Sequence, residues 1–144
     1  MKRDAEDERI EAILGDHIDS DFDEAVQVFC EYMRTHVSLP CEVTGMESFA
    51  WEEFYVFGPG SQREYGQLRK TQPSFRDRYT LVEISRDAES EWMLFPGEDL
   101  AAHVHRLSDG KEFHLGLAEL RATDRQSENY RLLDDYSVWF VDNR

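Results

Sequence analysis

The sequence predicts an α+β domain: two N-terminal helices packed on a small antiparallel, SH3-like curled sheet, with a C-terminal helical segment. Two observations predict it. Apolar residues recur at helical spacing up to Pro40, and from Cys41 onward short aromatic and β-branched runs alternate with turn signals. The 144 residues suit one domain. We expect residues 1–144 to be helical over 4–38, mainly β over 41–116, and helical again over about 129–141.

The first helix is expected from Asp4 to about Gly15, with Ile10, Ile13 and Leu14 on one stripe. A second helix should begin near Ser20 or Asp21, because acidic residues favour the positive end of a helix. Its apolar stripe has spacings typical of a helix and consists of Phe22, Val26, Phe29, Met33 and Val37. Pro40 ends this helix.

The second part of the chain is predicted to be mostly strands. Expected strands cover 41–46, 49–57, 79–85, 92–95, 100–108 and 111–115. Residues 61–72 are a loop or a short helix, and 116–120 form a short helical turn. The terminal element has both a helical and an alternating apolar pattern, and we favour a helix there.

A hairpin is expected at Asp109-Gly110, because these residues suit a two-residue turn between strands. The resulting register places His105 opposite His114 and Val104 opposite Leu115. The alternation of a strand then separates two faces. The inner face carries Ala102, Val104, Phe113 and Leu115, and the outer face carries His103, His105, Glu112 and His114.

The charge of the chain is its strongest functional signal. There are 31 acidic against 16 basic residues, for a formal net charge of -15. Such an excess destabilises a compact chain by self-repulsion, so we expect a compensating hard cation or a basic protein partner. Nucleic acid is excluded as a partner, because its phosphates would be repelled.

Several classes of protein are not expected. No apolar run is long enough to span a membrane, and the N-terminus lacks the apolar core of a signal peptide. We therefore expect a cytoplasmic protein without membrane contact, in which Cys30 and Cys41 are reduced. No catalytic motif for hydrolysis, phosphate binding or dinucleotide binding is found, so an enzyme is not expected.

An acidic stretch offers hard oxygen ligands near the start of the second helix. Our candidate calcium ligands are Asp16, Asp19, Asp21, Asp23 and Glu24. Asp19 opens a D-x-D-x-D pattern like that of an EF-hand loop, but Glu24 and Cys30 replace the required Gly and Glu. The stretch is therefore not an EF-hand, and a solvated helix-capping segment remains an alternative.

The histidine face of the hairpin is an alternative metal site. Directly opposed side chains lie about 4.5–5.5 Å apart, so His103, His105, His114 and Glu112 could reach one ion. Imidazole ligands suit a transition metal rather than calcium. We favour ordinary surface histidines and do not expect a transition metal. One further segment, 63–78, is basic and can either contact the protein's own acids or bind an anion.

Three patches of the sequence resemble the CcbP-type calcium-binding proteins of cyanobacteria and other bacteria. They are Arg3-Asp-Ala-Glu6 with Glu8-Arg-Ile10, Phe29 to Tyr32 with Val37-Ser-Leu-Pro40, and Phe113 to Leu120 with Asp135-Tyr-Ser-Val-Trp139. The resemblance implies a compact α/β fold, calcium binding without an EF-hand, and a buffering or signalling role.

These observations predict a small acidic cytoplasmic protein that binds Ca²⁺ through surface carboxylates and has no enzymatic activity. The alternative is an acidic binding module, of the immunity or inhibitor type, that neutralises a basic protein partner. The oligomeric state is left open.

Overall fold

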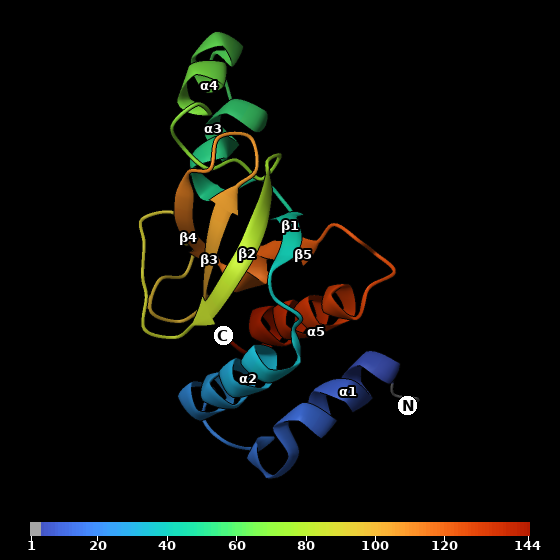
Figure 1. Cartoon of the computed structure of the whole chain (residues 1–144). Coiled ribbons are helices and arrows are strands. Elements are labelled where there is room, and N and C mark those ends of the chain that lie inside the picture. Colours follow the sequence, from blue (N-terminus) through green and yellow to red (C-terminus); the bar gives the residue numbers. More distant parts are fainter. Residues whose placement is uncertain (1–3) are drawn as a thin grey trace.

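The structure is a computed structural model that describes residues 4–144, so Arg3 of the first resembling patch lies outside it. Within these residues five strands form one antiparallel sheet in the order β4-β3-β2-β1-β5. Figure 1 shows α1, α2 and α5 gathered at one end of the sheet, with the short helices α3 and α4 at the opposite end.

The predicted α+β fold is confirmed, and its elements have the following bounds. The helices are α1 (Ala5–Leu14), α2 (Phe22–His36), α3 (Glu53–Val56), α4 (Gln62–Leu68) and α5 (Glu128–Asn143), with 3-10 turns η1 (Gly15–His17), η2 (Ala50–Glu52) and η3 (Leu117–Glu119). The strands are β1 (Cys41–Gly45), β2 (Arg78–Ser85), β3 (Ala101–Arg106), β4 (Glu112–Gly116) and β5 (Leu120–Ala122).

Both N-terminal helices begin at the capping residues that the sequence suggests. The Asp4 side chain accepts a hydrogen bond from the Asp7 N–H, and the Asp21 side chain accepts one from the Glu24 N–H, at 2.8 Å in each case. The second helix ends at His36, ahead of a cis Leu39-Pro40 bond. These caps place the acidic stretch around Asp21 in the connection between two helices.

The core forms where α2 and α5 meet the inner face of the sheet. Phe29 is fully buried and lies against the rings of Tyr136 and Trp139, with centroids 5.5 and 4.8 Å away. In α5 the buried residues Leu132, Leu133, Tyr136, Trp139 and Phe140 recur at helical spacing. Burial on this stripe decides for a helix where the sequence also allowed a strand.

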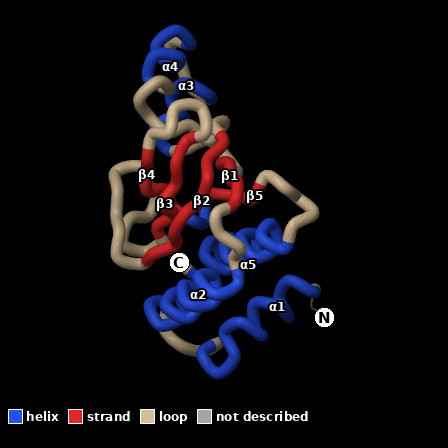
Figure 2. The backbone as a smooth tube through the Cα atoms, viewed as in Figure 1, coloured by secondary structure: helices blue, strands red, loops and turns tan. Residues whose placement is uncertain are grey.

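Two predicted strands are wrong. Residues 49–57 form η2 and α3, because the buried Glu52 carboxylate accepts hydrogen bonds from the N–H groups of Phe49 and Phe75 at 3.1 and 2.9 Å. Residues 92–95 form turns in the connection between β2 and β3. Figure 2 shows this connection as a loop beside β4, where the Ser90 hydroxyl donates to the His114 carbonyl.

The predicted hairpin register is also wrong, although its faces are right. His103 pairs with His114, His105 with Glu112, and Val104 with Phe113, a shift of two residues from the expected pairing. The loop is longer than a two-residue type I′ turn. Such a turn needs positive φ at both Asp109 and Gly110, but of these two residues only Gly110 has positive φ (75°). A shift of two leaves every side chain on its predicted face.

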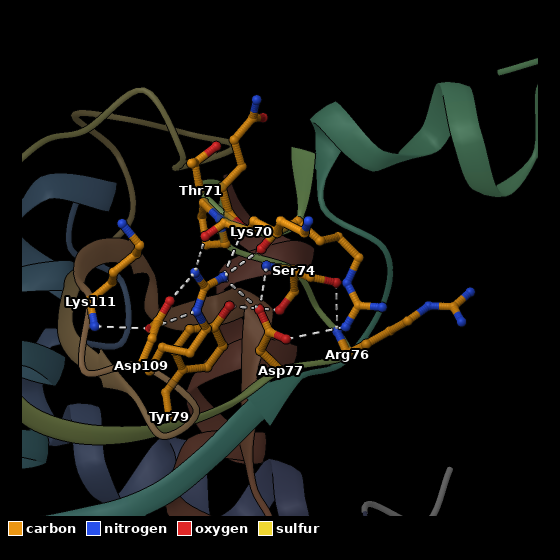
Figure 3. A network of polar contacts seen from close by, with 12 residues as sticks. Lys70, Thr71, Ser74, Arg76, Asp77, Tyr79, Asp109 and Lys111 are labelled. Carbon is orange, nitrogen blue, oxygen red and sulfur yellow. Dashed lines mark hydrogen bonds and ion pairs between the residues drawn. The ribbon is translucent and has the colours of Figure 1, made fainter. Parts of the chain in front are cut away.

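Arg106 explains why the loop is longer. Its guanidinium is 3 % exposed, donates to both oxygens of Asp109 at 3.1 and 2.8 Å, and donates to Asp77 at 3.0 Å. The remaining donors reach three backbone carbonyls, those of Arg69, Lys70 and Gln72. Figure 3 shows the Asp77 and Asp109 carboxylates pointing toward one centre. Asp109 is therefore a partner of a buried cation rather than a turn residue alone.

Replacing this cation should destabilise the protein strongly. We expect Arg106→Met to lower the free energy of unfolding by about 3–5 kcal/mol, because two carboxylates and three carbonyls lose their donor in a buried site. The matched control is Arg131→Met, whose ion pair with Glu128 has side chains 48 % and 61 % exposed. It should cost less than about 1 kcal/mol. Urea unfolding measures the free energy of unfolding of both variants. An equal decrease in the two variants would contradict the proposed role of Arg106.

Candidate functional site

A cluster of three carboxylates lies between the first and last helices. Glu6 comes from α1, Asp134 and Asp135 come from α5, and their ligand oxygens lie within 4.8 Å of one another. Asp135 is 1 % exposed and accepts two hydrogen bonds of 2.9 Å from the Arg9 guanidinium. The cluster therefore has a fixed inner side, while Glu6 and Asp134 are partly accessible.

The electrostatics of this cluster are unfavourable without a cation. The pKa of Glu6 is raised to about 8, first by burial and then by Asp134 and Asp135, which act as hydrogen-bond acceptors and as negative charges. Asp135 in turn raises the pKa of Arg9. Among the described residues Arg9 is the only cation paired with these carboxylates. One guanidinium thus faces three acids, an arrangement that a divalent ion would relieve.

The predicted calcium ligands lie in and beside the connection between α1 and α2. Asp16 lies in η1, Asp19 in the following turn, and Asp21 caps α2. The Asp23 carboxylate pairs with Arg86 at 3.1 Å, and the Glu24 carboxylate lies 3.0 Å from His17. Within residues 4–144 these five acids do not form a group with ligand oxygens within 4.8 Å of one another.

The alternative site lies on the outer face of the sheet, at β3 and β4. A single carboxylate oxygen of Glu112 lies 2.8 Å from Nε2 of His103 and 3.1 Å from Nε2 of His105. The His114 ring stacks on His103 with centroids 4.8 Å apart. The ligand atoms of His103, His105 and Glu112 lie within 4.8 Å of one another, and His103 is already hydrogen-bonded to the Glu112 carboxylate without an ion.

A buried acidic pair was not predicted from the sequence as a site. Asp99 accepts hydrogen bonds from the Tyr136 hydroxyl at 2.6 Å and from the Ala118 N–H at 3.1 Å. The pKa of Asp99 is raised to about 7, because burial and the nearby Glu119 charge outweigh the lowering effect of its hydrogen bonds from Tyr136 and Ala118. Burial likewise raises the pKa of Glu119 to about 6. Asp99 joins the loop before β3 to α5 and η3, which is a structural role.

Sequence reasoning also missed the part that Glu6 plays. Asp134-Asp135 is visible as an acidic pair, but Glu6 lies 128 positions away from Asp134, and no local pattern links them. The available signal was the spacing of Glu6 and Arg9 on one face of the first helix. That signal shows a charged helix face without showing what it contacts.

The fold defines the class of protein to which the chain is similar. It matches two solved structures over almost its full length. One is Anabaena CcbP, with a TM-score of 0.56 and 15% identity, covering 96% of this chain and 92% of that one. The other is a calcium-binding protein in its calcium-binding form, with a TM-score of 0.55 and 13% identity, covering 98% and 93%. The chain therefore shares its fold with calcium-binding proteins.

Two further comparisons place the chain in no family. No family model matches it, and no curated protein matches its sequence.

In the described residues no helix is both long enough and apolar enough to cross a membrane.

The titration of Asp99 predicts a pH dependence of stability. Its pKa is about 7 in the folded protein against an ordinary value of 3.8, so the folded state holds the proton more tightly. The stability contributed by this proton is complete below pH 3.8 and is lost as the pH rises through 7. Asp99→Asn should therefore remove a slope of up to about 1.4 kcal/mol per pH unit.

Chemical unfolding between pH 4 and pH 8 measures this slope. Glu119 and Glu6 contribute slopes of the same sign, so the comparison is between the wild type and each variant. Asp142→Asn, which changes an exposed acid near the end of α5, is the control and should keep the wild-type slope. An unchanged slope in Asp99→Asn would show that Asp99 is ionised in the folded protein.

Proposed function

We propose that the protein binds Ca²⁺ through the carboxylates of Glu6, Asp134 and Asp135. The observation that carries the proposal is the approach of three carboxylates to within 4.8 Å of one another, with Arg9 as their only paired cation in the part of the chain that the structure describes. The shared fold with two solved proteins, one named as calcium-binding, supports the choice of ion. The net charge of -15 attracts any divalent cation toward the site.

The chemistry of calcium suits this cluster better than that of magnesium. Calcium accepts six to eight oxygen ligands in irregular arrangements, whereas Mg²⁺ requires an octahedron and releases its water reluctantly. Three carboxylates and several waters can fill such a shell. Because the Arg9 guanidinium already donates to both oxygens of Asp135, Glu6 and Asp134 would supply the accessible ligand oxygens, and Glu6, with a pKa of about 8, would release its proton as the ion binds.

Calcium at this position would act on the packing of α1. The ion would connect Glu6 on α1 with Asp134 on α5, and it would take the place of the proton that the raised pKa of Glu6 keeps on this pair at neutral pH. A ligand that binds only the folded state stabilises it by RT ln(1+[L]/Kd). We propose a buffering or signalling role in the cytoplasm without enzymatic activity, in which the ordering of α1 reports the bound ion.

Binding of a basic protein partner remains the second candidate function. The sequence offers Tyr32, Trp51 and Tyr55 as aromatic residues beside acids that could contact such a partner, but Tyr55 is buried and Trp51 and Tyr32 are half-buried. Phe54 and Phe57 are instead exposed, by 55 % and 79 %, on and next to α3 and beside Glu53. Exposed aromatic residues next to acids suit a basic surface with apolar contacts.

Calcium should raise the melting temperature more than magnesium does. In buffer treated to remove divalent ions, we expect about 1 mM Ca²⁺ to give the larger shift, because the site is irregular and partly occupied by Arg9. Thermal unfolding with CaCl₂, MgCl₂ and NaCl at equal ionic strength measures this. Equal shifts with all three salts would reduce the effect to screening and refute a specific site.

Two double variants locate the ion. Glu6→Gln/Asp134→Asn should weaken calcium binding by at least about tenfold, because it removes both accessible charges of the cluster. Asp19→Asn/Asp23→Asn changes the net charge equally, leaves the Asp21 cap intact, and should stay within about twofold of the wild type. Calorimetric titration compares them. The opposite order would place the ion in the 16–24 stretch, and an absence of binding to the wild type would refute the calcium proposal itself.

A further inference from the structure

Four arginines of this acidic chain line one pocket. The pocket has a volume of about 460 Å³ and lies where β1, β2 and β5 meet the segment before β2. Its arginines are Arg76, Arg78, Arg121 and Arg125, and its walls include Thr44 and Phe75. No Asp or Glu is among the described residues that line it. In a chain with a net charge of -15, this is the reverse of the expected surface.

The sheet brings two of these arginines to the same face. Thr44 on β1 pairs with Arg78 on β2 on one side and with Arg121 on β5 on the other. Directly paired residues point to the same face of a sheet, with Cβ atoms about 5 Å apart. Arg78 and Arg121 therefore flank Thr44, and the loop residues Arg76 and Arg125 complete the pocket.

Among the described residues the four pocket arginines have no acidic partner, as is also the case for the exposed Arg34 and Arg63 outside the pocket. Six other arginines form ion pairs with Asp or Glu, namely Arg9, Arg69, Arg86, Arg106, Arg131 and Arg144. Within residues 4–144 no carboxylate oxygen lies within 4.0 Å of a guanidinium nitrogen of the four arginines at the pocket. The nearby Glu42 carboxylate instead accepts a hydrogen bond of 2.6 Å from the Thr123 hydroxyl.

The wall of the pocket is held by close backbone contacts. The Thr44 hydroxyl contacts the carbonyls of Phe75 and Asp77 at 3.1 and 2.8 Å, and the Gly45 N–H donates to the Phe75 carbonyl at 3.2 Å. A Cβ atom on Gly45 would lie 2.6 Å from Cβ of Phe75, so only glycine allows this approach. The site is therefore built on paired strands and a fixed connection.

We propose that this pocket binds a small organic molecule that carries two or more phosphate groups. Guanidinium groups present planar pairs of donors that match phosphate oxygens, and four of them suit a ligand with several negative charges. The volume lies in the range of small-molecule sites, about 300–1,000 Å³. Phe75 and Met46 supply apolar surface for the organic part of the ligand.

The net charge of the protein restricts the length of the ligand. A short polyphosphate lies within the local field of the four arginines, whereas a long nucleic acid also meets the acidic remainder of the surface and is repelled. Calcium binding at Glu6 and Asp134 plays no part in this argument, so the two proposals can fail separately.

Calorimetric titration tests the pocket with pyrophosphate and ATP as probes. The full-length protein is used in about 50 mM NaCl, after removal of divalent ions by a chelating resin, because a soluble chelator is itself a polyanion. We expect saturable binding of both probes. Citrate, which carries similar charge without phosphate, and a single-stranded 20-nucleotide DNA should bind at least about tenfold more weakly. Equal binding of citrate would overturn the phosphate assignment, and tighter binding of DNA would overturn the small ligand.

Variants test whether the arginines are responsible. Arg78→Gln/Arg121→Gln should weaken pyrophosphate binding by at least about tenfold, since two charge-assisted contacts are lost. The control Arg34→Gln/Arg63→Gln changes the net charge equally at exposed positions outside the pocket and should remain within about twofold. Equal losses in both variants, or no saturable binding to the wild type, would overturn the proposal.

A third variant guards against a loss of folding. Arg125 is exposed in the connection between β5 and α5, so Arg125→Gln leaves the paired strands intact. Circular dichroism and the melting temperature check that each variant is folded. If the double variant unfolds, Arg125→Gln alone should still weaken pyrophosphate binding by about threefold or more, and wild-type affinity in this folded variant would refute the site.

Discussion

The buried Arg106 guanidinium is the interaction on which one end of the molecule depends. It lies at the end of β3 on the inner face, where a cation is stable only if every donor finds an acceptor. Asp77, Asp109 and three carbonyls of the 69–72 segment supply these acceptors. One side chain therefore fixes the hairpin loop after β3 and the connection that leads into β2. The same connection carries Phe75 and Arg76, so the geometry of the arginine pocket follows from the satisfaction of this charge.

The sequence predicts the features of the fold that depend on interactions between residues close together in the chain. The spacing of apolar residues and the acids at Asp4 and Asp21 located α1 and α2, because periodicity and capping act within a few residues. The strand prediction for 49–57 failed since aromatic content indicates burial without distinguishing a helix from a strand. The helical conformation is fixed by the Glu52 carboxylate, which accepts hydrogen bonds from Tyr65, Ser74 and Phe75. These partners lie 13 to 23 positions later in the chain, so a pattern of neighbouring residues cannot reveal them.

The candidate sites also contain features that local sequence patterns predict and features that they do not predict. The histidine face was predicted correctly even though the register was wrong, because a shift of two residues preserves the alternation of a strand. His103, rather than His105, pairs with His114, and that detail depends on the partners of Asp109. The carboxylate cluster could not be predicted, since Glu6 and Asp134 meet only after α1 packs on α5. Charge density identified an acidic stretch, but it could not identify which acids the fold brings together.

The chain separates its charges instead of neutralising them uniformly. Within residues 4–144, Glu6, Asp134 and Asp135 converge with one paired arginine, while Arg78, Arg121 and their two loop neighbours line a pocket without a carboxylate. Each concentration of like charge raises the energy of the unliganded protein and lowers it again when an ion of opposite sign binds. The fold thus holds opposite concentrations of charge at two separate places, and the calcium and phosphate proposals assign one ligand to each.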